Sequence, residues 1–405
     1  MHEILLINVS GQDRPGLTVA LAEALSRHEV TVLDMGQAVI HDNLAWGMLV
    51  EVPRSASDGP VYKDLLFAVH QLGLQLRITP VSEEEYGQWV QAQGRPRHTI
   101  TLLGRQISAH HIAGIAKTVT AKNLNIDRIQ RLSGRASLTT PIAARRAAIE
   151  LTVSGVVADL GAMRSGFLQL SRELEVDIAI QADDAFRRTR RLVCFDMDST
   201  LVQTEMIDEL AHAAGVGLAV EDITARAMAG ELDFEQSFRK RVGLLKGLDT
   251  AVLDEIAQHM PLTEGAERLV RTLKSLGYTV AILSGGFHFF AERLRDRLGI
   301  DYVYANELPS RDGRLTGEVS GPIVDGARKA ELLRKIAEAE GLSLQQTIAV
   351  GDGANDLPML SIAGLGVAFQ AKPLVRDRVA HGIANLGLDG VLYLLGMRDR
   401  ELVSI

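Results

Sequence analysis

The sequence predicts an α/β protein built from two small modules and a larger domain with a parallel sheet. The apolar patterns of residues 1–90 indicate the order β-α-β-β-α-β, and the same order recurs in residues 97–182. From residue 190 onward strands alternate with helices, which favours a parallel sheet with right-handed crossovers. A length of 405 residues is too great for one ordinary core and agrees with this division.

In the first module, a strand ends in a turn whose Pro15 suits the first turn of the following helix. A pair of strands, an amphipathic helix and a last strand complete the order, which is typical of a ferredoxin-like module. The predicted strands are residues 3–9, 30–40, 44–52 and 74–81, and the predicted helices are residues 17–25 and 61–72.

The second module follows the polar stretch 91–96 and repeats the order of elements without repeating the residues. A charged connection at residues 183–191 comes next. We expect a solvated linker there rather than a nucleic-acid-binding arm, because the run is short and the chain is acidic. The predicted strands are residues 98–103, 126–132, 147–153 and 176–180, and the predicted helices are residues 111–122 and 161–174.

The centre of the larger domain is an apolar strand, residues 192–195, that ends in Asp196 and Asp198. Open α/β sheets place their sites at the carboxyl ends of strands. Two carboxylates there repel each other unless a cation or a shared proton lies between them. A single Asp-x-Asp is also an ordinary strand terminator and turn former, so the assignment depends on later residues.

Helical patterns fill residues 203–265, and strands and helices alternate again afterwards. We therefore predict a helical cap at 203–265, inserted into a core made of residues 190–202 and 266–396. The predicted helices are residues 206–214, 220–228, 234–244, 255–258, 290–298 and 330–340, the predicted strands are 278–283, 302–304, 347–350 and 367–369, and 313–318 is part of a hairpin.

Composition and charge narrow the class of protein. The net charge of -8 argues against a general nucleic-acid surface, and no uncharged apolar run reaches the ~18 residues of a membrane span. The chain opens Met-His-Glu, without a basic and then apolar signal segment. Its one cysteine, Cys194, lies in an apolar run and cannot form an intrachain disulfide. We expect a cytoplasmic protein that binds neither nucleic acid nor membrane.

The stretch 11–17, Gly-Gln-Asp-Arg-Pro-Gly-Leu, resembles the strand-to-helix turn of the amino-acid-binding ACT module. The resemblance implies that Asp13 and Gly16 line a pocket for an amino-acid effector such as serine, and that two chains pair their sheets in a homodimer. A glycine lets a ligand approach backbone N–H groups at a helix N-terminus, although these residues also suit an ordinary turn. The matching stretch 104–109 lacks the Asp-Arg-Pro-Gly signature, so ligand binding by the second module stays open.

Four motifs of the larger domain carry a second resemblance: Asp-Met-Asp-Ser-Thr at 196–200, Ser-Gly-Gly-Phe at 284–287, Lys329, and Gly-Asp-Gly-Ala-Asn-Asp at 351–356. In order and context they closely resemble the haloacid-dehalogenase-type phosphohydrolases over residues 190–396. Cap segments 205–208 and 234–242 resemble the phosphoserine phosphatases of that family, and the tandem ACT-like half resembles their long, regulated form. The implied fold is a Rossmann-like parallel-sheet core with a helical cap, preceded by two ferredoxin-like ACT modules.

The implied chemistry is phosphate-ester hydrolysis with Mg²⁺. Mg²⁺ prefers hard oxygen ligands, so Asp196 and Asp352 are the natural side-chain ligands. The resemblance adds the backbone carbonyl of Asp198 as a ligand and Asp356 as the residue that orients the metal's waters. Asp196 is expected to attack phosphorus and form an aspartyl phosphate. Asp198 is expected to protonate the leaving alkoxide and then to activate water.

The phosphoryl group is expected to be held by the Ser284 hydroxyl and the backbone N–H of Gly285. Lys329 is expected to supply positive charge during transfer. Without the family pattern, Lys329 would count as one more exposed lysine.

Substrate choice is expected to lie in the cap. Glu205 would pair with the ammonium of phosphoserine and Arg241 with its carboxylate, where a guanidinium can be bidentate. Asn355 would add a polar contact, and Met228 and Phe234 would close over the ligand. Taken without the resemblance, Met228 and Phe234 are helix-packing residues and Arg241 belongs to a solvated basic face.

We therefore expect hydrolysis of O-phospho-L-serine to L-serine and phosphate, the last step of serine biosynthesis, regulated through the ACT half. One alternative is a phosphatase for another small ester, such as phosphothreonine or a sugar phosphate, against which only the cap residues speak. The other is an amino-acid-responsive regulatory protein with weak hydrolase activity, against which the intact set of catalytic motifs speaks.

Overall fold

The computed structural model describes residues 2–53 and 59–402, except for the side chain of Met228. The chain forms two compact units, one ending at Arg95 and one beginning at Pro96. Each unit is described by itself.

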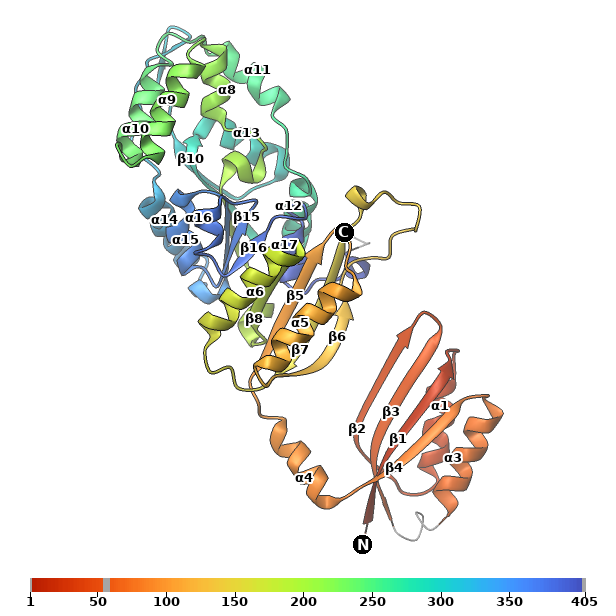
Figure 1. Cartoon of the computed structure of the whole chain (residues 1–405). Coiled ribbons are helices and arrows are strands. Elements are labelled where there is room, and N and C mark those ends of the chain that lie inside the picture. The colour runs from red at the N-terminus through yellow and green to blue at the C-terminus, as the bar shows by residue number, and fades with distance from the viewer. Residues whose placement is uncertain (1, 54–58, 403–405) are drawn as a thin grey trace. The chain divides into compact units, whose positions relative to one another are not determined.

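The N-terminal unit is a four-stranded antiparallel sheet in the order β2-β3-β1-β4, with two helices packed on one face (Figure 1). The predicted order β-α-β-β-α-β is confirmed. Buried residues alternate along β3, as expected of a strand with one face against a core. The elements are β1 (His2–Gln12), α1 (Leu17–Ser26), β2 (Thr31–Ile40), β3 (Asn43–Pro53), α3 (Pro60–Gln71), β4 (Gln75–Val81) and α4 (Glu83–Ala92).

Helix α4 was not predicted. Its N-terminus is set by a capping box, in which Ser82 accepts a hydrogen bond from the backbone of Glu85 and the Glu85 carboxylate accepts one from the backbone of Ser82. No residue of α4 is buried, so its sequence lacks the apolar periodicity on which the prediction relied.

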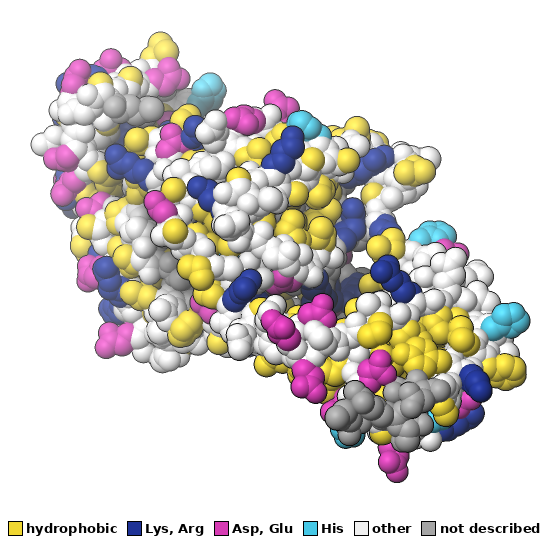
Figure 2. Space-filling view, turned by 60° about the horizontal axis from the view of Figure 1, so that its bottom comes forward, with side chains coloured by type: hydrophobic (Ala, Val, Ile, Leu, Met, Phe, Trp, Pro, Cys, Tyr) yellow, Lys and Arg dark blue, Asp and Glu magenta, His cyan; other side chains and the backbone are white. Residues whose placement is uncertain are grey.

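Strand β2 is an exposed edge of this sheet. Large apolar side chains at Val32, Met35 and Ile40 are 49%, 54% and 78% exposed. Figure 2 shows hydrophobic side chains gathered on one face of the N-terminal unit. Long apolar edge strands offer unpaired backbone groups to another chain.

The C-terminal unit begins with the second module, an antiparallel sheet in the order β6-β7-β5-β8 with α5 and α6 against one face. It repeats the topology of the first module, as predicted. Its elements are β5 (Arg97–Gly104), α5 (Ala109–Ala121), β6 (Asn125–Arg131), β7 (Ala147–Ser154), α6 (Leu160–Leu174) and β8 (Asp177–Ala182).

The rest of the unit is a six-stranded parallel sheet in the order β11-β10-β9-β14-β15-β16. Side chains of β9 alternate between two cores, because successive residues of a strand face opposite sides. The elements are β9 (Leu192–Phe195), α12 (Ala266–Ser275), β10 (Thr279–Phe287), α13 (His288–Leu298), β11 (Tyr302–Asn306), α14 (Gly326–Ala339), β14 (Thr347–Gly351), α15 (Leu357–Ile362), β15 (Leu365–Phe369), α16 (Pro373–Arg376), β16 (His381–Ile383) and α17 (Gly390–Leu394).

The helical cap lies beyond the carboxyl ends of these strands (Figure 1). A small hairpin from the core region packs against it, since the N–H of Gly247 donates to the carbonyl of Leu315 and that of Thr250 to Gly313. The cap helices are α8 (Met206–Ala213), α9 (Gly217–Met228), α10 (Phe234–Gly243) and α11 (Ala251–His259), and the hairpin strands are β12 (Ser310–Arg311) and β13 (Arg314–Leu315).

The prediction of a solvated linker at residues 183–191 is wrong. The segment forms a short helix, α7 (Ala185–Arg188), and both Arg187 and Arg190 are buried. Arg187 pairs with Glu150 at 2.5 Å, and Arg190 donates to Gln181 at 3.1 Å. Acceptors distant in sequence thus compensate the burial of these charges, so the connection is part of the packed C-terminal unit.

Within the described residues, no helix combines the length and the hydropathy that a membrane span requires.

Candidate active site

The predicted site residues meet at one edge of the parallel sheet. Asp196 follows β9, Ser284 lies near the carboxyl end of β10, and Asp352 follows β14. These three strands are neighbours in the centre of the sheet, and the carboxyl ends of parallel strands share one edge. Lys329 reaches the same place from the first turns of α14, whose N-terminus is capped by Asp325.

A cluster of three carboxylates and one lysine, buried except for the half-buried Asp352, forms the floor of the site. Ligand oxygens of Asp196, Asp352 and Asp356 lie within 4.8 Å of one another. The Nζ of Lys329 lies 2.8 Å from Asp196 Oδ1 and 2.6 Å from Asp356 Oδ1. Lys329 and Asp356 are fully buried. The lysine is therefore a buried partner of two carboxylates, and the alternative of an exposed lysine is wrong.

Charge in this cluster is unbalanced, with three carboxylates around one ammonium. Burial, together with the charge of Asp356, raises the pKa of Asp196, and the same causes raise the pKa of Asp352 to about 7. Burial lowers the pKa of Lys329, but the charges of Asp196 and Asp356 outweigh this effect and raise it. Such a site favours a bound cation, which would let all three carboxylates ionise.

Asp198 lies in a tight turn, residues 197–201, in which Ser199 has a left-handed φ of 56°. Its Oδ1 accepts a hydrogen bond from the N–H of Met206 at 3.3 Å. Burial and the nearby Glu205 raise the pKa of Asp198, which favours the protonated acid. A Cβ at Gly286 would lie 2.3 Å from Asp198 Oδ2, so only glycine leaves room for this carboxyl group.

The end of β10, residues 284–287, forms an irregular loop where the pairing with β11 is interrupted, and it is held by hydrogen bonds on both sides. Ser284 is buried, and its Oγ accepts a hydrogen bond from the N–H of Gly286 at 2.9 Å. Asn306 Nδ2 donates to the carbonyl of Gly285 at 2.8 Å, and Asn306 Oδ1 accepts from the N–H of Val324 at 2.9 Å. The loop conformation is thus tied to the segment that leads into α14.

The cap brings Glu205 and Arg241 toward this floor. The Nε of Arg241 is buried and has no hydrogen-bond partner in the described part of the chain. Burial lowers the pKa of Arg241, while the charges of Glu205, Asp208 and Asp198 act in the opposite direction. Glu205 Oε1 accepts a hydrogen bond from Ser199 Oγ at 2.7 Å. Arg241 is thus half-buried beside acidic groups, unlike the exposed Arg239 of the same helix.

Phe234 approaches the loop at Gly285 from the cap. A Cβ at Gly285 would lie 3.0 Å from its Cζ and 3.7 Å from Asn355 Nδ2, so both predicted substrate contacts border the same loop. The ring of Phe234 stacks on Phe238, with centroids 6.0 Å apart. The predicted partner of Phe234, Met228, has a side chain outside the described residues.

Three residues that the sequence analysis missed support this site. Thr200 Oγ1 donates to Asp352 Oδ1 at 3.1 Å. Asn306 holds the loop described above, and Asp208 adds a carboxylate beside Arg241. Thr200 belongs to the quoted motif and could have been found by asking what faces Asp352, whereas Asn306 stands in no motif.

The predicted effector residues lie on the surface of the N-terminal unit. Asp13 and Gly16 are exposed, and Gly16 has a φ of 93° at the start of α1. A concave region of about 420 Å³ in this unit is lined by the sheet residues Asn8, Trp46 and Arg77, among others. Neither Asp13 nor Gly16 is among the described residues that line it.

Comparisons with known proteins agree with this fold and geometry. Residues 193–361 match the haloacid dehalogenase-like hydrolase family, and residues 3–79 and 96–181 each match an ACT domain. A solved haloacid-dehalogenase family hydrolase from Salmonella enterica is 30% identical, with a TM-score of 0.64, covering 73% of this chain and 98% of its own. The fold and the site define a hydrolase of this class.

Two full-length relatives narrow the class. The chain is 44% identical over 398 residues to a phosphoserine phosphatase of Streptomyces coelicolor, covering 98% of this chain and 93% of that protein. It is 41% identical over 399 residues to a phosphoserine phosphatase of Mycobacterium tuberculosis, covering 98% and 94%. The chain therefore belongs to the phosphoserine phosphatase family of haloacid dehalogenase-like hydrolases, in a form with two ACT domains.

Proposed function

We propose that this enzyme hydrolyses O-phospho-L-serine to L-serine and phosphate. One observation carries the proposal: a carboxylate–lysine cluster lies beneath a cap in which the buried Nε of Arg241 has no partner among the described residues. The cluster suits a doubly charged phosphate with its metal, and the guanidinium suits the substrate's carboxylate. The names of the full-length relatives support the same substrate.

We propose Mg²⁺ as the cofactor, because the donor set consists of hard oxygens. Asp196, Asp352 and the backbone carbonyl of Asp198 would hold it. Both oxygens of Asp356 are already engaged, one by Lys329 and one by the N–H of Gly353, which supports an indirect role for this residue. When bound, Mg²⁺ supplies positive charge that shields the carboxylates from the substrate phosphate.

Catalysis begins at Asp196. Its Oδ1 accepts hydrogen bonds from Lys329 and from the N–H of Met197, which leaves Oδ2 as the attacking oxygen. Attack forms a bond from Oδ2 to phosphorus while the bond from phosphorus to the serine oxygen breaks. Asp198 gives its proton to that oxygen and releases serine. It then takes a proton from water, whose oxygen attacks phosphorus, releases phosphate and restores Asp196.

The cap residues orient the substrate. Glu205 would accept hydrogen bonds from the ammonium group, and Arg241 would bind the carboxylate. Ser284 and the N–H of Gly285 would contact the phosphoryl oxygens, with Lys329 beside them. Asn355 borders the loop at Gly285, and Phe234 excludes water above it.

The nucleophile is tested with Asp196→Asn. Phosphate release from phosphoserine should fall to background, and phosphate-labelled substrate should leave no label on the protein that hydroxylamine can remove, because an amide cannot form the acyl phosphate. Asp312→Asn, an exposed aspartate in the hairpin, is the matched control. Turnover by Asp196→Asn at more than a trace would remove Asp196 from the proposal.

The substrate is tested with Arg241→Met, compared with Arg239→Met on the same helix, which pairs with Glu235 on the surface. We expect Arg241→Met to lose about 10²-fold or more in kcat/KM for phosphoserine, the effect of one charge-assisted hydrogen-bonded pair, and far less for p-nitrophenyl phosphate. Equal losses on both substrates would contradict the carboxylate role and leave the phosphatase chemistry intact.

Regulation remains a prediction. We propose that L-serine binds near Asp13 and Gly16 of the first ACT domain, that two chains pair through this half, and that the enzyme works in the cytoplasm. The exposed apolar residues of β2 support pairing. Sedimentation of the full chain with and without serine tests both the dimer and the effector.

A further inference from the structure

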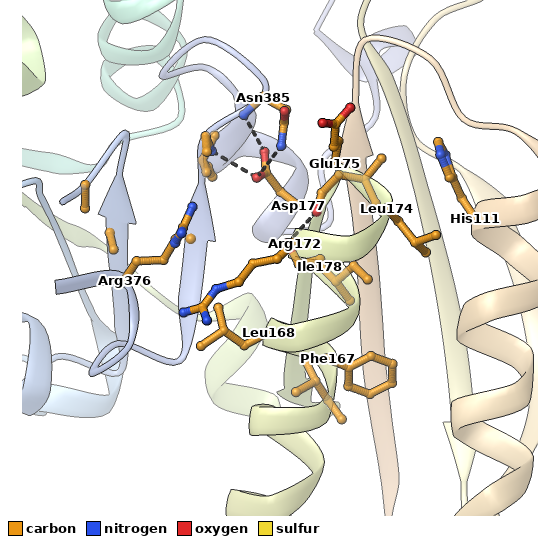
Figure 3. Close-up of a pocket in the computed structure, with 18 of the residues that line it drawn as sticks. His111, Phe167, Leu168, Arg172, Leu174, Glu175, Asp177, Ile178, Arg376 and Asn385 are labelled. Atoms are coloured by element: carbon orange, nitrogen blue, oxygen red, sulfur yellow. Dashed lines mark hydrogen bonds between the residues drawn. The ribbon is translucent and has the colours of Figure 1, made fainter. Parts of the chain in front are cut away.

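A large cavity lies between the second ACT domain and the edge of the parallel sheet. Its volume is about 820 Å³, and its walls are α6 and β8 on one side and β16 and α16 on the other (Figure 3). The two domains are joined beside it, because Asp177 at the start of β8 accepts hydrogen bonds at 2.9–3.0 Å from Ala384 and Asn385. None of the proposed catalytic residues is among the described residues that line it.

The lining is cationic. Four arginines, Arg105, Arg164, Arg172 and Arg376, face two carboxylates, Glu175 and Asp177. Both oxygens of Asp177 already accept hydrogen bonds from the β16 side, so this carboxylate is satisfied within the protein. The lining residues therefore carry more positive than negative charge, part of which Glu264 and Asp377 balance from outside the lining.

Two of these arginines form ion pairs with neighbouring carboxylates, and the other two form none among the described residues. Arg105 forms a bidentate pair with Glu264, and Arg172 pairs with Asp377. In the described part of the chain, the guanidinium groups of Arg164 and Arg376 form no ion pair or hydrogen bond, and the Nε of Arg376 is buried. The charge of Arg376 does oppose the rise that burial causes in the pKa of Asp177. A buried N–H without an acceptor is costly, and its usual explanation is a water, an ion or a ligand. Figure 3 shows Arg376 and Arg172 extending into the same space.

The remaining wall is apolar. Leu168 of α6, Ile178 of β8, Ile383 of β16 and Ala368 of β15 line the cavity. A concave, mostly apolar space of several hundred Å³ with a few charged groups is typical of small-molecule sites.

We propose that this cavity binds a small organic anion, with its carboxylate or phosphate group at Arg376 and Arg164 and its apolar body against Leu168, Ile178 and Ile383. The ligand would contact β15 at Ala368, whose neighbour in the sheet register is Gly351, directly before Asp352. The site is thus separate from the proposed catalytic centre but touches the strand next to the one that carries a proposed metal ligand.

The test uses the full chain and the fluorescent anion 8-anilinonaphthalene-1-sulfonate, with its uncharged relative N-phenyl-1-naphthylamine. We expect a saturable component of anionic dye binding that weakens about tenfold or more in Arg376→Met and in Arg164→Met, the loss of one charge-assisted contact. Arg334→Met, an exposed arginine on α14, should bind as the unmodified protein does. The uncharged dye should respond to none of the three variants.

A further variant tests the cavity without removing a charge, and unfolding measurements control for misfolding. Leu168→Trp fills the cavity without changing its charge and should abolish the same component, while thermal unfolding midpoints report whether each variant is folded. Displacement of the dye by phenylacetate and by phenylphosphonate distinguishes a carboxylate from a phosphate ligand. Equal dye binding by the unmodified protein, Arg376→Met and Leu168→Trp would overturn the proposal.

Discussion

Replacing Lys329 by methionine tests the cluster on which the proposed chemistry rests. Methionine keeps an apolar stem of similar length and removes the ammonium group with its charge and its N–H donors. Lys329 is fully buried, and its Nζ lies 2.8 Å from Asp196 and 2.6 Å from Asp356. Its removal leaves Asp196 and Asp356, both buried, without their shared cation.

The expected magnitude follows from these contacts. Loss of one preorganised group that stabilises developing charge costs about 10²–10³ in rate. Removal of one partner from a buried ion pair costs about 3–5 kcal/mol of stability, unless the carboxylates take up a proton instead. Burial and Asp356 already raise the pKa of Asp196, so losing the ammonium raises it further. The acid limb of the rate profile should therefore move to higher pH.

The assay is single-turnover phosphate release from phosphoserine at saturating Mg²⁺, measured across pH, with chemical unfolding of the same samples. Lys335→Met on the same helix is the control, since Lys335 is exposed. A Lys329→Met enzyme that is folded and keeps its rate within about threefold would refute the reasoning, because an effect of that size is below what one charged contact contributes.

Three further predictions concern other parts of the molecule. Asn306→Leu should lower kcat/KM for phosphoserine by about ten- to a hundredfold, because the buried carbonyl of Gly285 loses its partner; unchanged kinetics would contradict this role. The pKa of Asp352, raised to about 7, should make Mg²⁺ affinity of the substrate-free enzyme rise about tenfold from pH 6 to 8, with proton release seen by calorimetry in two buffers, whereas affinity independent of pH would argue against it. Burial lowers the pKa of His381 from 6.5 to about 3, so its contribution to stability is complete above pH 6.5 and is lost on acidification. The free energy of unfolding, measured with urea, should fall by about 2 kcal/mol from pH 6.5 to 5, and His381→Leu should lack this part of the pH dependence.

The catalytic edge of the sheet could be predicted because the sequence patterns that define it lie within short segments. Each motif directly follows a strand or opens a helix, and parallel strands bring their carboxyl ends together whatever the loops between them do. The apolar run before Asp196 and the one before Asp352 were therefore enough to place these residues near each other. The role proposed for Lys329 needed the family pattern, since a lysine beside Arg328 would otherwise count as exposed.

Other features depend on partners that no local pattern reveals. The burial of Arg187 and Arg190 is compensated by Glu150 and Gln181, which belong to other elements. The cavity beside Asp177 has walls from residues about 200 positions apart, as the hydrogen bonds of Asp177 with Asn385 illustrate. Helix α4 buries no side chain and therefore has no apolar period to detect.

The most direct test of the central claim is phosphate release from phosphoserine, phosphothreonine and a sugar phosphate, each with Mg²⁺ and with a chelator. The proposed mechanism and cap assignments predict metal-dependent turnover confined mainly to phosphoserine. Comparable rates on all three esters would contradict the roles of Glu205 and Arg241. If none of the three esters released phosphate, the proposed chemistry of Asp196 itself would be contradicted.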